Sequence, residues 1–258
     1  MTELIDTHVH LYDSDFESDL ADVITIAKSN GVSKIILPAV DSSTYNKMTE
    51  LSLSLQGFAY PSLGLHPTSV NDNWRDELEF VLENIDQQRY IAIGEIGLDG
   101  YWSKEHFPEQ IIVFEEQLRF AARRELPVII HSRDATEEIL NVLERNSDLL
   151  LRGVFHAFSG SYETYRRILR AGNFKIGVGG VVTYKNSNLP AVLEKVALES
   201  IVLETDAPWL TPAPFRGKRN QPSYVKIIAE KVAEIKGCSF DEICSVTSAN
   251  AKNIFNFR

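Results

Sequence analysis

Short apolar runs alternate with longer amphipathic stretches along almost the whole chain. The apolar runs predict eight strands, at residues 4–10, 34–40, 58–66, 90–98, 127–132, 151–159, 174–180 and 200–206. The stretches between them repeat apolar residues at helical spacing, as in residues 15–31, where Gly31 ends the predicted helix. The apolar face of that helix comprises Phe16, Leu20, Val23, Ile24 and Ala27.

This alternation predicts an α/β protein with a parallel sheet, because parallel strands need a helical crossover between them. Eight such units in 258 residues predict a closed (β/α)8 TIM barrel. The open doubly wound sheet is the alternative, but it usually has five or six strands. Residues 222–237 and 239–257 predict additional C-terminal helices. No linker-like segment interrupts the pattern, so we expect a single domain over residues 1–258.

The overall charge limits the class of partner. The formal net charge is −10 and the isoelectric point is about 5.1, which argues against a protein that coats nucleic acid with its whole surface. The net charge does not exclude an enzyme that binds a phosphate locally. The sequence shows neither a secretory leader nor an apolar run long enough for a membrane span. We therefore expect a cytoplasmic protein without membrane contact, and no obligate protein partner is evident.

The stretch IDTHVH, residues 5–10, places three polar side chains on one face of a predicted strand. Successive side chains of a strand alternate, so Asp6, His8 and His10 point the same way. The other histidines end the third and fifth predicted strands, lie late in the sixth, or follow the fourth. In that order, they are His66, His131, His156 and His106. In a barrel of this kind, these positions share one mouth, where active sites are found.

Two carboxylates join the histidines. Glu95 ends the fourth predicted strand and Asp206 ends the eighth, both after apolar runs where an unpaired charge is costly. A cation at the mouth would remove that cost. A single histidine here is more simply explained as a structural residue, but that explanation is weak for the whole set. The six candidate ligands, enough for two divalent ions that share one carboxylate, are His8, His10, Glu95, His131, His156 and Asp206.

These motifs resemble those of the TatD-type metal-dependent deoxyribonucleases of the amidohydrolase superfamily. The stretches that carry the resemblance lie within residues 5–209, and SANAKNIF near the end also fits. They are IDTHVH, GLHP, GEIGLD, LPVIIHSR, HAFSGS, IGVGG and VLETDAPWL. The resemblance therefore covers essentially the whole chain.

The resemblance implies two metal sites that share the Glu95 carboxylate. The residues implied for one ion are His8, His10 and Asp206. Those implied for the other are His131 and His156. His66 resembles the histidine of the family that contacts the substrate. We favour Asp6 as a residue that orients the metal histidines over Asp6 as a direct ligand.

The implied mechanism is hydrolysis. Bound divalent ions lower the pKa of a water molecule to near neutrality, and Asp206 is the candidate base that takes the proton of this water. His66 and the second ion would stabilise charge on the oxygens of the scissile group. Histidine ligands suit Zn²⁺ or Mn²⁺, whereas the resemblance implies that Mg²⁺ is often used.

A basic segment in this acidic chain predicts a phosphate site. FRGKRNQP, residues 215–222, follows the eighth predicted strand, where such barrels often bind phosphate. Its candidate substrate-binding residues are Arg216, Lys218 and Arg219, although a solvated turn would look the same. Glycines in GVGG, residues 177–180, permit close backbone approach. Arg133 either reaches the mouth or pairs with Glu137 one helical turn on.

Three functions fit these patterns. The favoured one is a dinuclear metal-dependent phosphodiesterase, a deoxyribonuclease with DNA as substrate. The alternative is a dinuclear hydrolase of carboxylic esters or amides, for example aminoacyl esters, because both chemistries need activated water and a polarised oxygen. The basic segment favours the first. A metal-binding protein without catalysis is disfavoured, because Asp206 and His66 exceed what a closed structural site requires.

Overall fold

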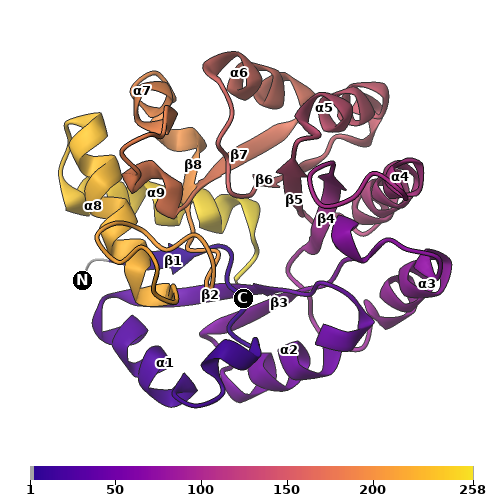
Figure 1. Cartoon of the computed structure of the whole chain (residues 1–258), viewed down its shortest axis with the longest axis horizontal. Helices are drawn as coiled ribbons and strands as arrows, with labels where there is room; N and C mark the ends of the chain where they lie inside the picture. Colours follow the sequence, from indigo (N-terminus) through magenta and orange to yellow (C-terminus); the bar gives the residue numbers. More distant parts are fainter. Residues whose placement is uncertain (1–2, 258) are drawn as a thin grey trace.

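Eight parallel strands form a ring in the computed structural model, which describes residues 3–257 (Figure 1). Their apolar, β-branched composition suits strands that are buried on both faces. The strands are β1 (Leu4–Asp6), β2 (Val32–Pro38), β3 (Ala59–Ser62), β4 (Ile93–Asp99), β5 (Val128–Arg133), β6 (Arg152–Phe155), β7 (Asn173–Val178) and β8 (Ile201–Leu203).

Strands neighbour one another in chain order, and two junctions complete the ring. Parallel ladders join β1 to β2 and β2 to β3, and join β4 through β8 in chain order. Leu63, just after β3, forms a parallel bridge with Ile93 of β4. Thr7, just after β1, donates its backbone N–H to the carbonyl of Leu203 in β8 at 3.0 Å. The predicted (β/α)8 barrel is confirmed.

Helices surround the strands (Figure 1). The helix predicted over residues 15–31 begins only at Leu20, and Phe16 lies before it in the 3-10 turn η1 (Ser14–Phe16). Short 3-10 turns occupy several loops, including η2 (Pro67–Ser69), η4 (Gly180–Thr183) and η6 (Pro222–Tyr224). The helices are α1 (Leu20–Ser29), α2 (Ser42–Ser54), α3 (Trp74–Asn84), α4 (Phe107–Arg123), α5 (Thr136–Arg145), α6 (Tyr162–Ala171), α7 (Leu189–Leu193), α8 (Val225–Lys236) and α9 (Phe240–Ile254).

The end of α9 packs into the amino-terminal end of the barrel. The apolar side chains that meet there are Ile5, Ile36, Ile91, Ala92, Ile129, Val154, Val202, Ala251, Ile254 and Phe255. A second, larger apolar cluster fills the layer between strands and helices. The polar mouth therefore lies at the opposite end of the strands, and the additional C-terminal helix seals the base.

All eight strands differ from the predicted ranges at one or both ends, and several of the differences concern site residues. Three strands, β3, β6 and β8, end before His66, His156 and Asp206, which lie in the loops that follow. β1 ends at Asp6, so His8 and His10 follow the strand instead of ending it. The segment after β1 stays beside the segment after β8, because His10 donates its backbone N–H to the carbonyl of Ala207 at 2.8 Å. β4 begins at Ile93 and ends at Asp99, so Glu95 is its third residue and does not end the strand. The last residue of the strand, Asp99, places a further carboxylate at the mouth.

A single domain over residues 1–258 stays a prediction, and residues 1, 2 and 258 lie outside the described range. Within residues 3–257, no helix combines the length and apolar character that crossing a bilayer requires.

Candidate metal centre

Three histidines converge on the carboxylate of Glu95, which is buried in β4. One oxygen, Oε2, lies 3.1 Å from Nε2 of His8. The other, Oε1, lies 3.0 Å from Nδ1 of His131 and 3.2 Å from Nε2 of His156. Each histidine comes from a different strand end. The barrel thus brings together residues that are up to 148 positions apart in the sequence, as the distance from His8 to His156 shows.

His10 and Asp206 complete one side of this cluster. Oδ1 of Asp206 lies 3.7 Å from Nε2 of His8 and 3.8 Å from Nε2 of His10. The two histidine nitrogens are 3.1 Å apart. Asp206 has a left-handed backbone, with φ of 56°, and its N–H bonds to the carbonyl of His8 at 2.9 Å. Aspartate tolerates this conformation better than most residues, so it can turn its carboxylate into the cluster.

Hydrogen bonds outside the cluster determine which ring nitrogen of His10 and of His156 carries the proton. Tyr12 donates its hydroxyl proton to the carbonyl of Pro38, so it accepts one from Nδ1 of His10, 2.8 Å away. Nδ1 of His156 donates in the same way to Glu204, at 3.1 Å. When these rings are neutral, Nε2 of each carries no proton, and its lone pair points at the cluster. An unprotonated ring nitrogen of this kind can bind a metal ion.

His66 has the opposite arrangement. The backbone N–H of Thr68 donates to Nδ1 of His66 at 3.1 Å, so in the neutral ring the proton must sit on Nε2. Nε2 lies 3.5 Å from Oε1 of Glu95. His66 is close enough to Glu95 and His131 to belong to a metal-binding group by distance. Its hydrogen bonding instead makes it a donor toward the pocket, which suits contact with a substrate oxygen.

Two carboxylates of the centre were missed at the sequence level. Asp99 lies 2.9 Å from Nε2 of His131 and so orients that ring from the side opposite Glu95. Glu204 orients His156 and also accepts the N–H of Ala157. Alternation could have revealed both, because Asp99 shares a strand face with Glu95, and Glu204 is two residues before Asp206. Such partners of ligating histidines set ring orientation and basicity.

Two glycines of the GVGG segment are closely approached by other parts of the protein. A Cβ atom on Gly177 would lie 2.1 Å from Oε2 of Glu204. One on Gly180 would lie 2.0 Å from the carbonyl oxygen of Leu210. The close approach that these glycines permit is therefore made by the protein itself, and Gly177 gives Glu204 its place beside His156.

Asp6 is buried but does not contact an imidazole. Its carboxylate accepts the N–H and hydroxyl of Thr205, at 2.9 and 2.6 Å, and the backbone N–H of His8 at 3.3 Å. Burial raises the pKa of Asp6 to about 8, against these hydrogen bonds. Asp6 thus holds the backbone of the segment that carries His8 against the segment that carries Asp206. His106 lies outside the cluster, 3.8 Å from Asp72.

The charges of the centre suit cations. Burial alone would raise the pKa of Glu95, but His156 and His8 hold it well below its ordinary value. Burial opposes protonation of His156, yet Glu95 and Glu204 raise its pKa to about 10. Four carboxylates, including Asp99 and Asp206, thus meet in one largely buried site, where uncompensated negative charge is costly.

The donor set fits divalent metal ions. Three groups have ligand atoms within 4.8 Å of one another: His8, His10 and Glu95; His66, Glu95 and His131; and His8, His156 and Glu204. Two buried atoms in the last group, Nδ1 of His8 and Oε2 of Glu204, have no hydrogen-bond partner within residues 3–257. Imidazole and carboxylate ligands of this kind are typical of Zn²⁺, Mn²⁺ and related ions.

The cluster lies at the bottom of a cavity of about 620 Å³ at the mouth of the barrel. Trp102 and Trp209 contribute to its walls and are 69% and 50% exposed, so neither serves the core. Arg133 also lines the cavity and stacks its guanidinium 3.7 Å from the centre of the Tyr101 ring. It does not take the alternative partner considered above, because Glu137 pairs with Arg167 at 2.6 Å.

The three cations of residues 215–222 have different surroundings. Arg219 forms a two-pronged ion pair with Asp19, at 2.7 and 2.9 Å, and stacks on Phe16. These contacts tie the segment to the residues just before α1 and occupy the guanidinium. Arg216 and Lys218 are exposed and form no ion pair with any described residue. Substrate binding by these residues stays a prediction, and the geometry favours Arg216 over Arg219.

A histidine and carboxylate cluster at the carboxyl mouth of a (β/α)8 barrel defines the class of this protein as a metal-dependent hydrolase. The chain matches the family model of the TatD related DNases over residues 5–256, and it belongs to that family.

Relatives agree with this assignment. The chain is 40% identical to a Bacillus subtilis protein named uncharacterized metal-dependent hydrolase YabD, over 98% of both chains. It is 33% identical to the human protein named deoxyribonuclease TATDN3, over 98% of this chain and 94% of that one. The crystal structure of YJJV, a TatD homologue from Escherichia coli, superimposes with a TM-score of 0.90 at 34% identity, covering 99% of this chain and 98% of that one.

Proposed function

We propose that this protein is a dinuclear metal-dependent phosphodiesterase whose substrate is DNA. The observation that carries the proposal is the Glu95 carboxylate, whose two oxygens face two different sets of histidine nitrogens. A carboxylate with this arrangement can bridge two ions. The human relative named a deoxyribonuclease supports the phosphodiester as the bond that is cleaved.

The proposed ligand sets follow the two oxygens of Glu95. On the Oε2 side, the ligands are His8, His10 and Asp206. On the Oε1 side, they are His131 and His156. Asp99 and Glu204 hold the rings of the second set in the orientation that directs a nitrogen at Glu95. The chemistry leaves Mg²⁺, Mn²⁺ and Zn²⁺ as candidate ions.

The proposed reaction uses two groups of the chain beyond the ligands. Bound divalent ions acidify water and polarise phosphoryl oxygens. Asp206 accepts the proton of the attacking water, and it returns this proton to the oxygen that leaves when the P–O bond breaks. Burial raises the pKa of Asp206 to about 6, which makes it a better proton acceptor than an ordinary carboxylate. His66 donates its Nε2 proton to a phosphoryl oxygen, where negative charge develops.

The walls of the cavity fit a nucleotide strand. Exposed tryptophans provide flat apolar faces for bases, and stacking of this kind is tolerant of sequence. Trp102 and Trp209 both border the cavity, and Arg133 adds a cation beside Trp102. An acidic protein can bind DNA in this way, because the positive charge that the phosphates require is needed only at the mouth.

The experiment that tests this proposal compares bond types in one protein sample. Purified protein with added Mg²⁺, Mn²⁺ or Zn²⁺ is assayed with oligodeoxynucleotides, a small phosphodiester, carboxylic esters and amides. The proposal predicts cleavage of both phosphodiester substrates and little turnover of the others. Turnover of esters or amides without any phosphodiester cleavage would replace the nuclease assignment with the alternative considered from the sequence.

A further inference from the structure

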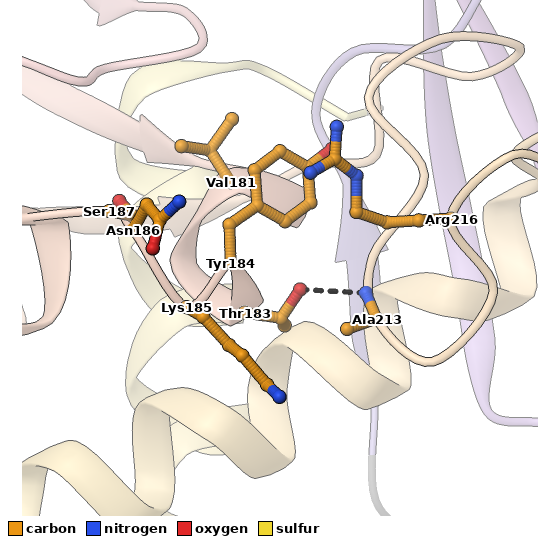
Figure 2. A pocket seen from close by; sticks show the side chains of 8 residues that line it. All are labelled: Val181, Thr183, Tyr184, Lys185, Asn186, Ser187, Ala213 and Arg216. Atoms are coloured by element: carbon orange, nitrogen blue, oxygen red, sulfur yellow. Dashed lines mark hydrogen bonds between the residues drawn. The ribbon is translucent and has the colours of Figure 1, made fainter.

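A second cavity adjoins the catalytic one, between the loops that follow β7 and β8. Its volume is about 550 Å³. The wall formed by Val181 is common to both cavities, so the two are neighbours across one side chain. The lining includes Tyr184, Lys185, Asn186 and Arg216, and Figure 2 shows these side chains around the space. We refer to it as the Tyr184 cavity.

The positive charge of the Tyr184 cavity is not neutralised by the protein. It is lined by two cations, Lys185 and Arg216, and none of its lining residues among those described carries a carboxylate. Neither cation forms an ion pair within residues 3–257. Two cations in one cavity, with no carboxylate among the described residues that line it, create a local positive potential, which favours an anionic ligand.

Arg216 is held so that its hydrogen-bond donors stay available. Its guanidinium lies over the Tyr184 ring, 4.1 Å from the ring centre (Figure 2). Stacking uses the face of the guanidinium and leaves the N–H groups in its plane free to bind two phosphate oxygens at once. Lys185 extends away from this stack in Figure 2, so Arg216 is the centre of the proposed anion site.

The walls are fixed before any ligand binds. The hydroxyl of Tyr184 donates to the carbonyl of Thr211 at 3.0 Å, which anchors the ring. Thr183 accepts the N–H of Ala213 at 2.8 Å, which joins the two loops at the floor of the cavity (Figure 2). A site that is ordered in advance loses less entropy on binding.

We propose that the Tyr184 cavity binds a phosphodiester group of the DNA strand that flanks the cleaved one, with Arg216 as the residue that recognises it. This proposal rests on the function proposed above. The site would make binding depend on strand length, because only a strand that reaches past Val181 engages Arg216. It assigns Arg216 to affinity and leaves bond cleavage to the centre around Glu95.

The test measures kcat and KM for oligodeoxynucleotides of two to eight nucleotides and for a small phosphodiester. Arg216→Ala should raise KM about tenfold for the longer strands, as loss of a charge-assisted hydrogen bond predicts, and leave the small phosphodiester unchanged. The dependence of binding on salt should flatten by about 0.7 in log–log slope, the value for one phosphate of a single strand. Values of kcat should stay near native.

Arg75→Ala provides a matched control. Arg75 is also an exposed arginine, stacked 4.3 Å from the centre of the Trp74 ring on α3, and it does not line the Tyr184 cavity. The substitution removes the same charge and the same kind of stack, so it should leave KM unchanged at every length. Tyr184→Leu removes the ring and should raise KM for long strands only, whereas Tyr184→Phe keeps the ring, loses only the bond to Thr211 and should raise this KM less.

Two outcomes would overturn the inference while the proposed function stands: an equal effect of Arg216→Ala at every strand length, or equal effects of Arg216→Ala and Arg75→Ala. Arg216→Lys separates charge from geometry, and we expect it to recover only part of the native affinity. Failure of the native protein to cleave any phosphodiester is a different result, because it would refute the proposed function and the inference together.

Discussion

At the scale of single residues, the centre is set by partners that lie outside the ring of ligands. Tyr12, Glu204 and Asp99 decide which nitrogen of a histidine faces Glu95, and the backbone of Thr68 turns His66 into a donor. The sequence predicted the ligand candidates, because histidines and carboxylates that end parallel strands must meet. Alternation could have placed Asp99 and Glu204 near the candidate ligands, but it could not show what they do, since their roles depend on ring orientations that only the folded chain fixes.

The first prediction concerns Asp206. Asp206→Asn should lower kcat for an oligonucleotide by about 10²- to 10⁴-fold, as removal of a general base typically does. Metal content should fall much less, because the amide oxygen can still coordinate and the other ligands remain. Metal analysis and kinetics on the same sample separate the two effects. Native turnover in this variant would assign the base to another residue.

The second prediction concerns the pH dependence of stability in metal-free protein. The pKa of His156 is raised to about 10 from an ordinary value of 6.5, so the folded state holds a proton that the unfolded chain loses. This contribution is fully present below pH 6.5 and is lost as the pH rises through about 10. Burial raises the pKa of Asp6 from 3.8 to about 8, so the folded state also holds this proton more tightly than the unfolded chain does. Stability therefore also falls as the pH rises from about 4 to about 8.

The Tm of chelator-treated protein should therefore fall as the pH rises from 7 to 9.5. Divalent ions should make the decline shallower. A metal-bound His156 has already lost its proton, so a rise in pH removes nothing further from it. His156→Gln in chelator should also show a shallower decline, and this variant is the matched control. A Tm that rises with pH in chelator, or one that falls equally in His156→Gln, would contradict the assignment.

At the scale of elements, the order and type of strands and helices followed from the apolar pattern, but their ends did not. β1 stops at Asp6 and β4 runs on to Asp99, because hydrogen bonds to neighbouring strands decide where a strand ends. Those neighbours lie far away in the sequence. The glycines of GVGG show the same limit, since the pattern predicts close approach but not what approaches.

The third prediction uses two of these glycines. Gly177→Ala would place a Cβ 2.1 Å from Oε2 of Glu204, so this carboxylate must move away from His156. Metal affinity should fall about 10- to 100-fold, the usual result of losing such a partner. Gly179→Ala is the control, because its Cβ would lie 3.7 Å from the nearest atom, an ordinary contact. Circular dichroism should show both variants folded, and equal metal affinities would refute the role given to Gly177.

At the scale of the whole molecule, the barrel separates stability from chemistry. The end of α9 and the strand interiors pack together at the base, whereas the polar groups gather at the mouth. The sequence predicted the barrel because eight strand and helix units leave few other arrangements. It did not predict the Tyr184 cavity, because loops from two successive units form it and neither loop has an apolar pattern.

The central claim is that two divalent ions around Glu95 carry phosphodiester cleavage. The most direct measurement removes all metal with chelator, returns Mn²⁺ stepwise, and follows oligonucleotide cleavage against ions bound per chain. We expect no cleavage without metal, recovery that levels off at about two ions per chain, and no recovery in Glu95→Ala. Full activity in excess chelator, with fewer than about one ion per ten chains, would contradict it.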